Sequence, residues 1–286
     1  MKRLKGIVNE LKISAENQHR DAEKLIREFI FYSPKMPLRL HQETLLAEST
    51  RFSLKVFDAY FTRQELEFNC FSWGSGATKV LLTHGWASKA ADFYELIVEL
   101  RKIDSLEIIA FDAPGNGSSN SEFSNLMLYA DAIKSIAENY ATPDILIGHS
   151  LGGMANVIAI QEIPLKPNLL ISIAPLIRLK ENFEKSMDSV NIGRLAQAHF
   201  FKNFSEEFPV NAEHFNLTSL YTLEADFNHF LAYDAEDHIS PYPFLAGFLA
   251  ENEGIKSKAY PGAGHYKILK STDVIADIVA LINSSL

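Results

Sequence analysis

The sequence contains a single cysteine, Cys70, among its 286 residues. A lone cysteine cannot form a disulfide within the chain, so a disulfide-stapled secreted domain is excluded. Free thiols are typical of reducing compartments, and we therefore expect a cytoplasmic protein. Cys70 lies in an apolar, strand-like segment, which favours a buried and inert thiol over a reactive one.

The sequence also lacks long apolar runs and an excess of positive charge. No segment approaches the run of about 18 apolar residues that a membrane-spanning helix needs, so we expect no membrane span. There are 27 Lys and Arg against 36 Asp and Glu, a net charge of −9 that disfavours a nucleic-acid partner. The basic residues Lys2, Arg3, Lys5 and Lys12 are followed by no apolar signal-peptide core. We expect the N-terminal segment to remain on the mature protein.

Sequence patterns for metal and nucleotide binding are absent as well. None of the nine histidines pairs with another at the spacing of helical metal ligands, and one cysteine provides no thiolate cluster. Neither a P-loop nor a complete dinucleotide-binding G-x-G-x-x-G is present. The sequence therefore predicts no metal and no cofactor.

The sequence does contain a Gly-His-Ser-Leu-Gly segment at residues 148–152, between the apolar run 145–147 and a helix-like stretch. In this setting G-x-S-x-G is typical of a nucleophile elbow, a strained turn that exposes a serine hydroxyl. The pattern is also short enough to occur by chance, and Ser150 would then only cap a helix. In the first interpretation Ser150 is a candidate nucleophile.

Candidate partners for Ser150 follow two further predicted strands. The strand over 227–233 leads to Asp234 and Asp237, and the strand over 255–260 leads to His265. A serine hydroxyl needs a base to become a nucleophile, and histidine is suited to that role because it titrates near neutral pH. A carboxylate would then orient the imidazole and stabilise its protonated form.

These segments resemble the α/β-hydrolase superfamily over about the last four-fifths of the chain. Residues 81–86 are similar to the family's turn on the oxyanion side, residues 111–119 to its turn after the fourth strand, and residues 264–265 to its histidine turn. The chain departs from the family at Asn116, where many members carry histidine or arginine, and at Asp234, where many carry glycine. The resemblance implies a serine esterase or lipase-like member with an N-terminal helical extension.

The resemblance also implies roles for individual residues. It assigns the triad to Ser150, Asp237 and His265, because Asp237 holds the family's position for the acid. Asp234, which lies nearer the strand, is either the alternative acid or a structural residue. Backbone N–H groups of Leu151 and Trp86 are the predicted donors of an oxyanion hole.

Strand and helix patterns alternate along the chain. The predicted strands cover 65–71, 79–83, 106–111, 145–147 and 169–174, and the predicted helices cover 91–102, 125–140 and 271–282. This alternation is typical of an α/β fold with a mostly parallel central sheet and helices on both faces. We predict an α/β-hydrolase core over 51–175 and 222–286, an N-terminal helical extension over 1–50 and a helical cap or lid insertion over 176–221.

The predictions for the insertion and for the extension are less specific. A lid would exclude water and shape an apolar pocket, with Phe200, Phe201 and His238 as candidate substrate-binding residues. An ordinary surface insertion, and a histidine that only lies at the rim, are the alternatives. Apolar residues of the extension such as Leu11 and Ile26 are expected to pack on the core, with a homodimer contact as the alternative.

The sequence therefore predicts a cofactor-independent serine hydrolase that cleaves a carboxylic ester of small or medium size through an acyl-enzyme. Its expected partner is a small-molecule ester or thioester. A thioesterase, an amidase or a carbon–carbon bond hydrolase of the same fold remains open. A non-catalytic binding module is the alternative from a different class, because fold does not prove function.

Overall fold

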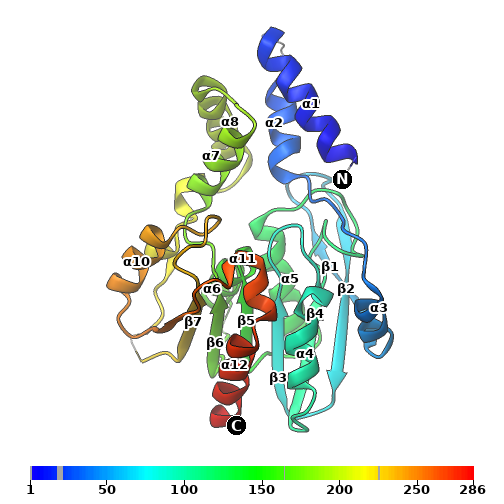
Figure 1. Cartoon of the computed structure of the whole chain (residues 1–286). Helices are drawn as coiled ribbons and strands as arrows, with labels where there is room; N and C mark the ends of the chain where they lie inside the picture. Colours follow the sequence, from blue (N-terminus) through cyan, green and yellow to red (C-terminus); the bar gives the residue numbers. More distant parts are fainter. Residues whose placement is uncertain (1, 18–21, 164, 225) are drawn as a thin grey trace.

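Eight strands form one sheet in the computed structural model, which describes residues 2–17, 22–163, 165–224 and 226–286 (Figure 1). The strands are β1 (Thr50–Phe57), β2 (Glu65–Gly74), β3 (Thr78–Thr83), β4 (Leu106–Phe111), β5 (Ile145–His149), β6 (Leu169–Ile173), β7 (His229–Tyr233) and β8 (Lys256–Ala259). Their order is β1-β2-β4-β3-β5-β6-β7-β8. β2 pairs antiparallel with both β1 and β4, and all other pairs are parallel. The predicted mostly parallel sheet is confirmed.

Helices cover both faces of this sheet. They are α1 (Lys2–Asn17), α2 (Ala22–Phe31), α3 (Leu40–Ala47), α4 (Tyr94–Leu100), α5 (Leu126–Asn139), α6 (Leu151–Glu162), α7 (Leu179–Ser189), α8 (Arg194–Glu207), α9 (Leu217–Leu220), α10 (Tyr242–Glu251), α11 (Gly264–Lys267) and α12 (Thr272–Ser285), with the 3₁₀ helices η1 (Ala90–Phe93), η2 (Ala212–His214) and η3 (Ile268–Lys270). Helices α4 and α12 pack on one face, and α5 and α6 pack on the other (Figure 1).

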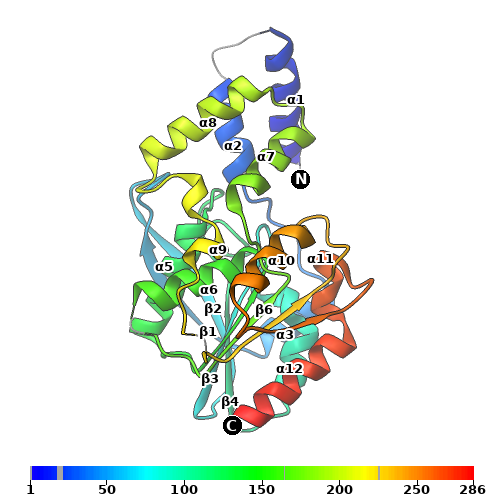
Figure 2. The same ribbon diagram turned by 90° about the vertical axis from the view of Figure 1, so that its left-hand side faces the viewer.

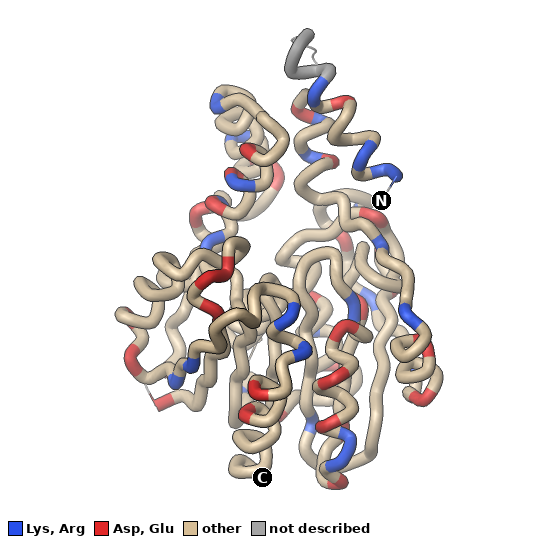
Figure 3. The backbone as a smooth tube through the Cα atoms, in the orientation of Figure 1, with Lys and Arg blue, Asp and Glu red and all other residues tan. Residues whose placement is uncertain are grey.

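The central strands β5 and β6 are apolar on both faces because both faces are covered. Along β5, Leu146 belongs to the hydrophobic cluster of α5 and α6, whereas Ile145 and Ile147 belong to the cluster of α4 and α12. Strands that are buried on both faces have nearly continuous apolar sequences. Neither β5 nor β6 contains Lys, Arg, Asp or Glu, and Figure 3 shows charged residues mainly along helices and loops.

The boundaries of several elements differ from the sequence prediction. The strand predicted over 106–111 coincides with β4, but the helix predicted over 91–102 is divided into η1 and α4. Strand β1 and helix α10 were not predicted. The alternation of Phe52, Leu54 and Val56 is the signal that β1 offers, since side chains along a strand point to opposite faces in turn.

Two groups of helices lie beyond the carboxyl edge of the sheet (Figures 1 and 2). The N-terminal helix pair consists of α1 and α2. The insertion helices are α7, α8, η2 and α9, which follow β6 and precede β7 in the sequence. We call the two groups together the roof. Phe31 at the end of α2 joins them, with its ring centroid 6.0 Å from that of Phe183 in α7 and 6.3 Å from that of Phe204 in α8. An ion pair between Arg27 and Glu207 adds a second link, with Nε and Oε2 3.0 Å apart.

Candidate active site

Ser150 lies on a sharp turn between β5 and α6. Its backbone has φ 52° and ψ −119°, and α6 begins at the next residue, Leu151. A positive φ is costly for a residue with a Cβ and persists only where the surrounding structure enforces it. The strained turn holds the serine at the carboxyl edge of the sheet.

The glycines on either side of Ser150 are required by close backbone approach. A Cβ at Gly148 would lie 2.6 Å from Cα of Gly153, and a Cβ at Gly152 would lie 2.2 Å from the carbonyl oxygen of Thr83. Both distances are far shorter than a van der Waals contact, and both neighbours are backbone atoms that cannot rotate away. Side chains at these two positions would displace Ser150 from the sheet edge.

His265 lies between Ser150 and Asp237. Its Nε2 is 2.9 Å from Oγ of Ser150, and its Nδ1 is 2.6 Å from Oδ2 of Asp237. The three residues are buried, with exposed fractions of 8% for Ser150, 7% for His265 and 6% for Asp237. Three loops that are distant in the sequence thus place a hydroxyl, an imidazole and a carboxylate in one hydrogen-bonded chain.

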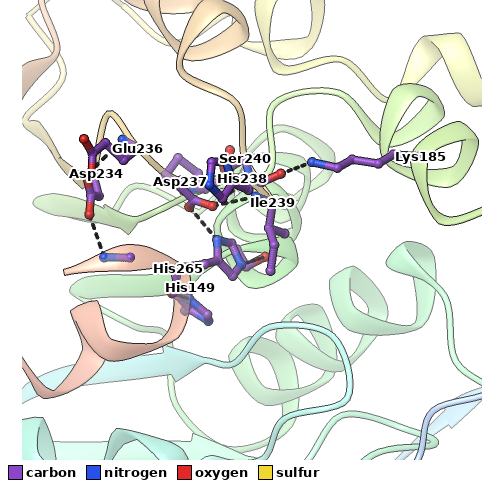
Figure 4. A network of polar contacts seen from close by, with 12 residues as sticks. His149, Lys185, Asp234, Glu236, Asp237, His238, Ile239, Ser240 and His265 are labelled. Atoms are coloured by element: carbon purple, nitrogen blue, oxygen red, sulfur yellow. Dashed lines mark hydrogen bonds and ion pairs between the residues drawn. The ribbon is translucent and has the colours of Figure 1, made fainter. Parts of the chain in front are cut away.

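The two aspartates after β7 have different partners (Figure 4). Besides His265, Asp237 accepts hydrogen bonds from the backbone N–H groups of Ile239 and Ser240. Burial alone would raise the pKa of Asp237, but the hydrogen bond and charge of His265, together with the two N–H donors, lower it below its ordinary value. Asp234 instead accepts from backbone N–H groups of Glu236 and Gly264, at 3.0 and 2.7 Å, and so fixes the two turns relative to each other.

The turn after β3 passes directly beside Ser150. A Cβ at Gly85 would lie 3.1 Å from Cβ of Ser150. His84 holds this turn, because its Nδ1 donates to the Gly85 carbonyl at 2.7 Å and its Nε2 accepts from the N–H of Ala113 at 3.0 Å. Burial lowers the pKa of His84, which keeps the imidazole neutral and able to accept that hydrogen bond.

Ser150 and His265 line a cavity of about 480 Å³. Its base also contains Gly85, Trp86, His149 and Leu151. Its walls come from the N-terminal segment (Leu4, Phe29, Ile30, Phe31, Tyr32, Pro34) and from the segment after β6 (Leu176, Leu179, Asn182, Phe183, Lys185, Ser186, Ser189). The volume lies within the range of about 300–1,000 Å³ that is usual for small-molecule sites.

Residues 80–278 match the alpha/beta hydrolase family. The chain belongs to this family. The matched range contains Ser150, Asp237 and His265, but it leaves out the N-terminal helix pair and the first two strands.

Two curated proteins resemble this alpha/beta hydrolase in sequence. A Mycoplasma genitalium protein named "Putative esterase/lipase 2" is 31% identical over 129 residues, which cover 44% of this chain and 45% of that protein. A monoglyceride lipase of Rattus norvegicus is 30% identical over 119 residues, which cover 38% of this chain and 39% of that protein. The chain thus matches less than half the length of either relative.

Solved structures show the same fold over most of the chain. An esterase from Pyrococcus furiosus superposes with a TM-score of 0.61 at 16% identity, covering 90% of this chain and 97% of that one. A thermophilic esterase from Thermogutta terrifontis gives a TM-score of 0.59 at 18% identity, covering 82% and 99%. Together with the family match, these neighbours confirm the α/β-hydrolase fold.

The three candidate substrate-binding residues do not line the Ser150 cavity. Phe200 is buried in the roof, with its ring centroid 6.0 Å from that of Phe183, and Phe201 packs beside Lys180. His238 is exposed, and its carbonyl accepts a hydrogen bond from Lys185 (Figure 4). From the insertion, Phe183 of α7 lines the cavity, whereas the cavity lining contains no residue of α8, all of which the structure describes.

His149 has a contact that the sequence did not indicate. Its Nε2 donates to the backbone carbonyl of His265 at 2.8 Å, and the two imidazole rings lie 4.9 Å apart. Burial lowers the pKa of His149 to about 3, so it stays neutral. The second residue of the elbow therefore supports the main chain that carries His265.

A second serine–histidine pair lies inside the sheet. Oγ of Ser172 in β6 is 2.9 Å from Nε2 of His229 in β7, and Nδ1 of His229 is 3.0 Å from the hydroxyl of Tyr221. Ser172 and His229 are almost completely buried, and no carboxylate among the described residues contacts His229. This network satisfies buried polar groups between two strands.

Over the part of the chain that the structure describes, no three His, Cys, Asp or Glu residues gather as a metal site would require. Over the same part, no helix is both long and apolar enough to cross a membrane. Cys70 is a free thiol buried in β2, and burial raises its pKa. The hydrolase family and the names of the relatives support an enzyme of the hydrolase class.

Proposed function

We propose that this protein is a serine hydrolase that cleaves carboxylic esters through an acyl-enzyme on Ser150. The observation that carries the proposal is the hydrogen-bonded chain from Ser150 through His265 to Asp237, at the base of the cavity. A base within 2.9 Å of a serine hydroxyl is within reach of the proton that it must remove.

The reaction follows from the positions of these groups. Nε2 of His265 takes the proton of the Ser150 hydroxyl as Oγ attacks the ester carbonyl carbon. The resulting imidazolium then gives this proton to the leaving alkoxide, the carbon–oxygen bond breaks, and the alcohol departs from an acyl-Ser150. A water molecule, deprotonated by His265, attacks the acyl group, and the acid leaves as Ser150 recovers its proton.

Asp237 and two backbone N–H groups stabilise the charges that develop. Because the pKa of Asp237 is lowered, its carboxylate is ionised at neutral pH and stabilises the imidazolium beside it. The N–H of Leu151 is the first of α6, where no helical carbonyl can accept it. We assign it, with the N–H of Trp86 on the turn after β3, to the oxyanion of the tetrahedral intermediate.

The cavity and the relatives favour an ester among the acyl compounds that this chemistry could cleave. The cavity walls are mainly apolar, and both curated relatives bear names of esterases or lipases. The insertion over 176–221 would act as a lid that excludes water from the acyl-enzyme. A thioester or an amide would use the same nucleophile.

The test is a panel of ester, thioester and amide substrates, assayed with the wild-type protein and two variants. Ser150→Ala should lower kcat for the ester by about 10⁴-fold or more, since it removes the nucleophile. Ser172→Ala is the matched control, because it alters another buried serine that contacts a histidine, and it should keep most of the activity. Faster thioester or amide turnover would reassign the substrate class, and full activity of Ser150→Ala would refute the proposal.

A further inference from the structure

The Ser150 cavity has a wall from outside the segment that matches the family. Leu4 of α1 and Phe29 of α2 line the cavity, and so do Tyr32 and Pro34 directly after α2. All four precede residue 80, where the family match begins. The N-terminal helix pair is therefore part of the site itself.

We propose that the N-terminal helix pair, through Leu4 and Phe29, binds the hydrocarbon chain of the ester and sets which chain lengths the enzyme accepts. This inference rests on the proposed ester hydrolase, and it names the substrate class of that site as esters with an apolar chain. The residues of the family motifs catalyse the reaction, and the N-terminal helix pair, which lies outside the family match, determines which substrates are accepted.

Within α1 and α2, Leu4 and Phe29 are the cavity-lining residues that retain apolar surface for a ligand. Their neighbours Ile30 and Phe31 are buried, with exposed fractions of 6% and 2%, because they pack within the roof. Leu4 and Phe29 are only partly buried against the core and face the cavity. Each methylene that leaves water for such a surface strengthens binding by about fourfold.

The wall is held in place by hydrogen bonds to the core. The N–H of Ser33 donates to the carbonyl of Glu122 at 2.9 Å, and the N–H of Ser124 donates to the carbonyl of Phe31 at 3.0 Å. The Ser33 hydroxyl donates to Oδ1 of Asn116 at 2.6 Å. Asn116 is one of the two positions where the chain departs from the family pattern, and its side chain anchors the residues directly after α2.

The wall is also held from the side of the insertion. Phe31 packs against rings of α7 and α8, and Arg27 bridges Glu207 and the carbonyl of Tyr60. With contacts on both sides, α2 has a defined position relative to Ser150. A wall fixed in this way can discriminate between chains of different length.

The part of the cavity lined by α7 is more polar. Asn182, Lys185, Ser186 and Ser189 line it alongside the apolar Leu179 and Phe183. An ester with one apolar and one polar arm would therefore place the apolar arm against the N-terminal helix pair. The structure thus favours an amphiphilic ester.

The test compares Phe29→Ala and Leu4→Ala with matched controls on two series of substrates. Phe201→Ala alters a partly buried phenylalanine of the roof that does not line the cavity, and Leu25→Ala does the same for a leucine of α2. One series lengthens the acyl group of p-nitrophenyl esters from acetyl to decanoyl, and the other lengthens the alcohol of alkyl acetates. The quantity measured is the ratio of kcat/KM between the longest and the shortest member.

We expect Phe29→Ala and Leu4→Ala to lower this ratio about tenfold in one of the two series, because the longest ester loses its apolar contact with the wall. The series that responds identifies the arm of the ester that the wall binds. Phe29→Leu should give an intermediate ratio, and both controls should keep the wild-type ratio. Unchanged ratios in both series, in variants that unfold at the wild-type denaturant concentration, would overturn the inference.

Failure of the proposed function would give a different result from failure of the wall assignment. If the wild-type protein cleaves no ester of either series, the hydrolase proposal fails and the wall is tested by binding alone. Decanoate is then titrated calorimetrically into wild type, Phe29→Ala and Phe201→Ala. Binding about tenfold weaker in Phe29→Ala only would sustain the wall assignment, and equal or absent binding in all three would overturn it.

Discussion

The base and the roof of the Ser150 cavity are built in different ways. The base consists of turns at the carboxyl ends of strands, and its groups are fixed by backbone hydrogen bonds and by glycines that admit no side chain. The roof consists of helices from two distant parts of the sequence, joined by phenylalanine rings and by polar contacts such as the ion pair between Arg27 and Glu207. We therefore propose that the chemistry, which needs fixed geometry, takes place where the sheet dictates positions, and that selectivity is set where helix packing dictates them.

The largest expected effect separates the two aspartates of the base. Asp237→Asn should lower kcat by about 10³–10⁴-fold, because an amide neither stabilises the imidazolium nor keeps His265 in the required tautomer. Asp234→Asn is the matched control and should have a much smaller effect, since Asp234 contacts backbone N–H groups only. The kcat of wild type and both variants is measured by steady-state kinetics on the ester that the wild-type protein cleaves fastest. The reverse ranking would move the acid role to Asp234.

A smaller effect, on stability, is expected in the roof. Phe31→Ala should lower the free energy of unfolding by about 3 kcal/mol, the lower end of the usual cost of removing a buried phenylalanine ring. The matched control is Phe57→Ala, because Phe57 is 57% exposed, and its loss should change stability by no more than about 0.5 kcal/mol. Urea unfolding of both variants measures the difference. Equal stability of the two would show that Phe31 does not join the two parts of the roof.

The smallest expected effect is a pH dependence of stability that arises from two buried histidines, His149 in the base and His229 in the sheet. Burial lowers the pKa of both His149 and His229 to about 3, against about 6.5 in an unfolded chain. Between these values the unfolded chain binds protons that the folded protein excludes. The free energy of unfolding should therefore rise with pH by about 1.4 kcal/mol per unit for each histidine, and this dependence should fade above about pH 6.5.

Variants of the two histidines isolate this contribution. Unfolding free energies of wild type, His149→Gln and His229→Gln are measured between pH 5 and pH 6, and each variant should lose one histidine's share of the slope. A glutamine at position 149 keeps an N–H donor for the carbonyl of His265. A slope as steep as that of wild type would mean that the substituted histidine is protonated in the folded protein.

The sheet and the residues of the base could be found from the sequence because their signals are local. A strand followed by G-x-S-x-G, or by an acid or a histidine turn, places each side chain at the same edge of a parallel sheet. The local sequence could not decide between Asp237 and Asp234. It depends on which carboxylate reaches an imidazole from another loop, and only Asp237 lies within 2.6 Å of His265.

The roof could not be derived in the same way. The spacing of Ile7 and Leu11 in α1, and of Ile26 and Ile30 in α2, indicates that one face of each helix is buried, but not what covers it. The same limit applies to Phe200, a predicted pocket residue, and to Phe183, which lines the cavity. Both are aromatic residues of helices in the insertion, and only the docking of α7 and α8 decides which ring reaches the cavity.

The most direct test of the central claim is labelling of the folded protein with a fluorophosphonate, followed by peptide mapping in a mass spectrometer. The reagent forms a stable bond only with a serine that a neighbouring base activates. We expect one adduct, on Ser150, which disappears in Ser150→Ala and persists in Ser172→Ala. No adduct on the folded wild-type protein, or equal labelling of Ser150→Ala, would contradict it.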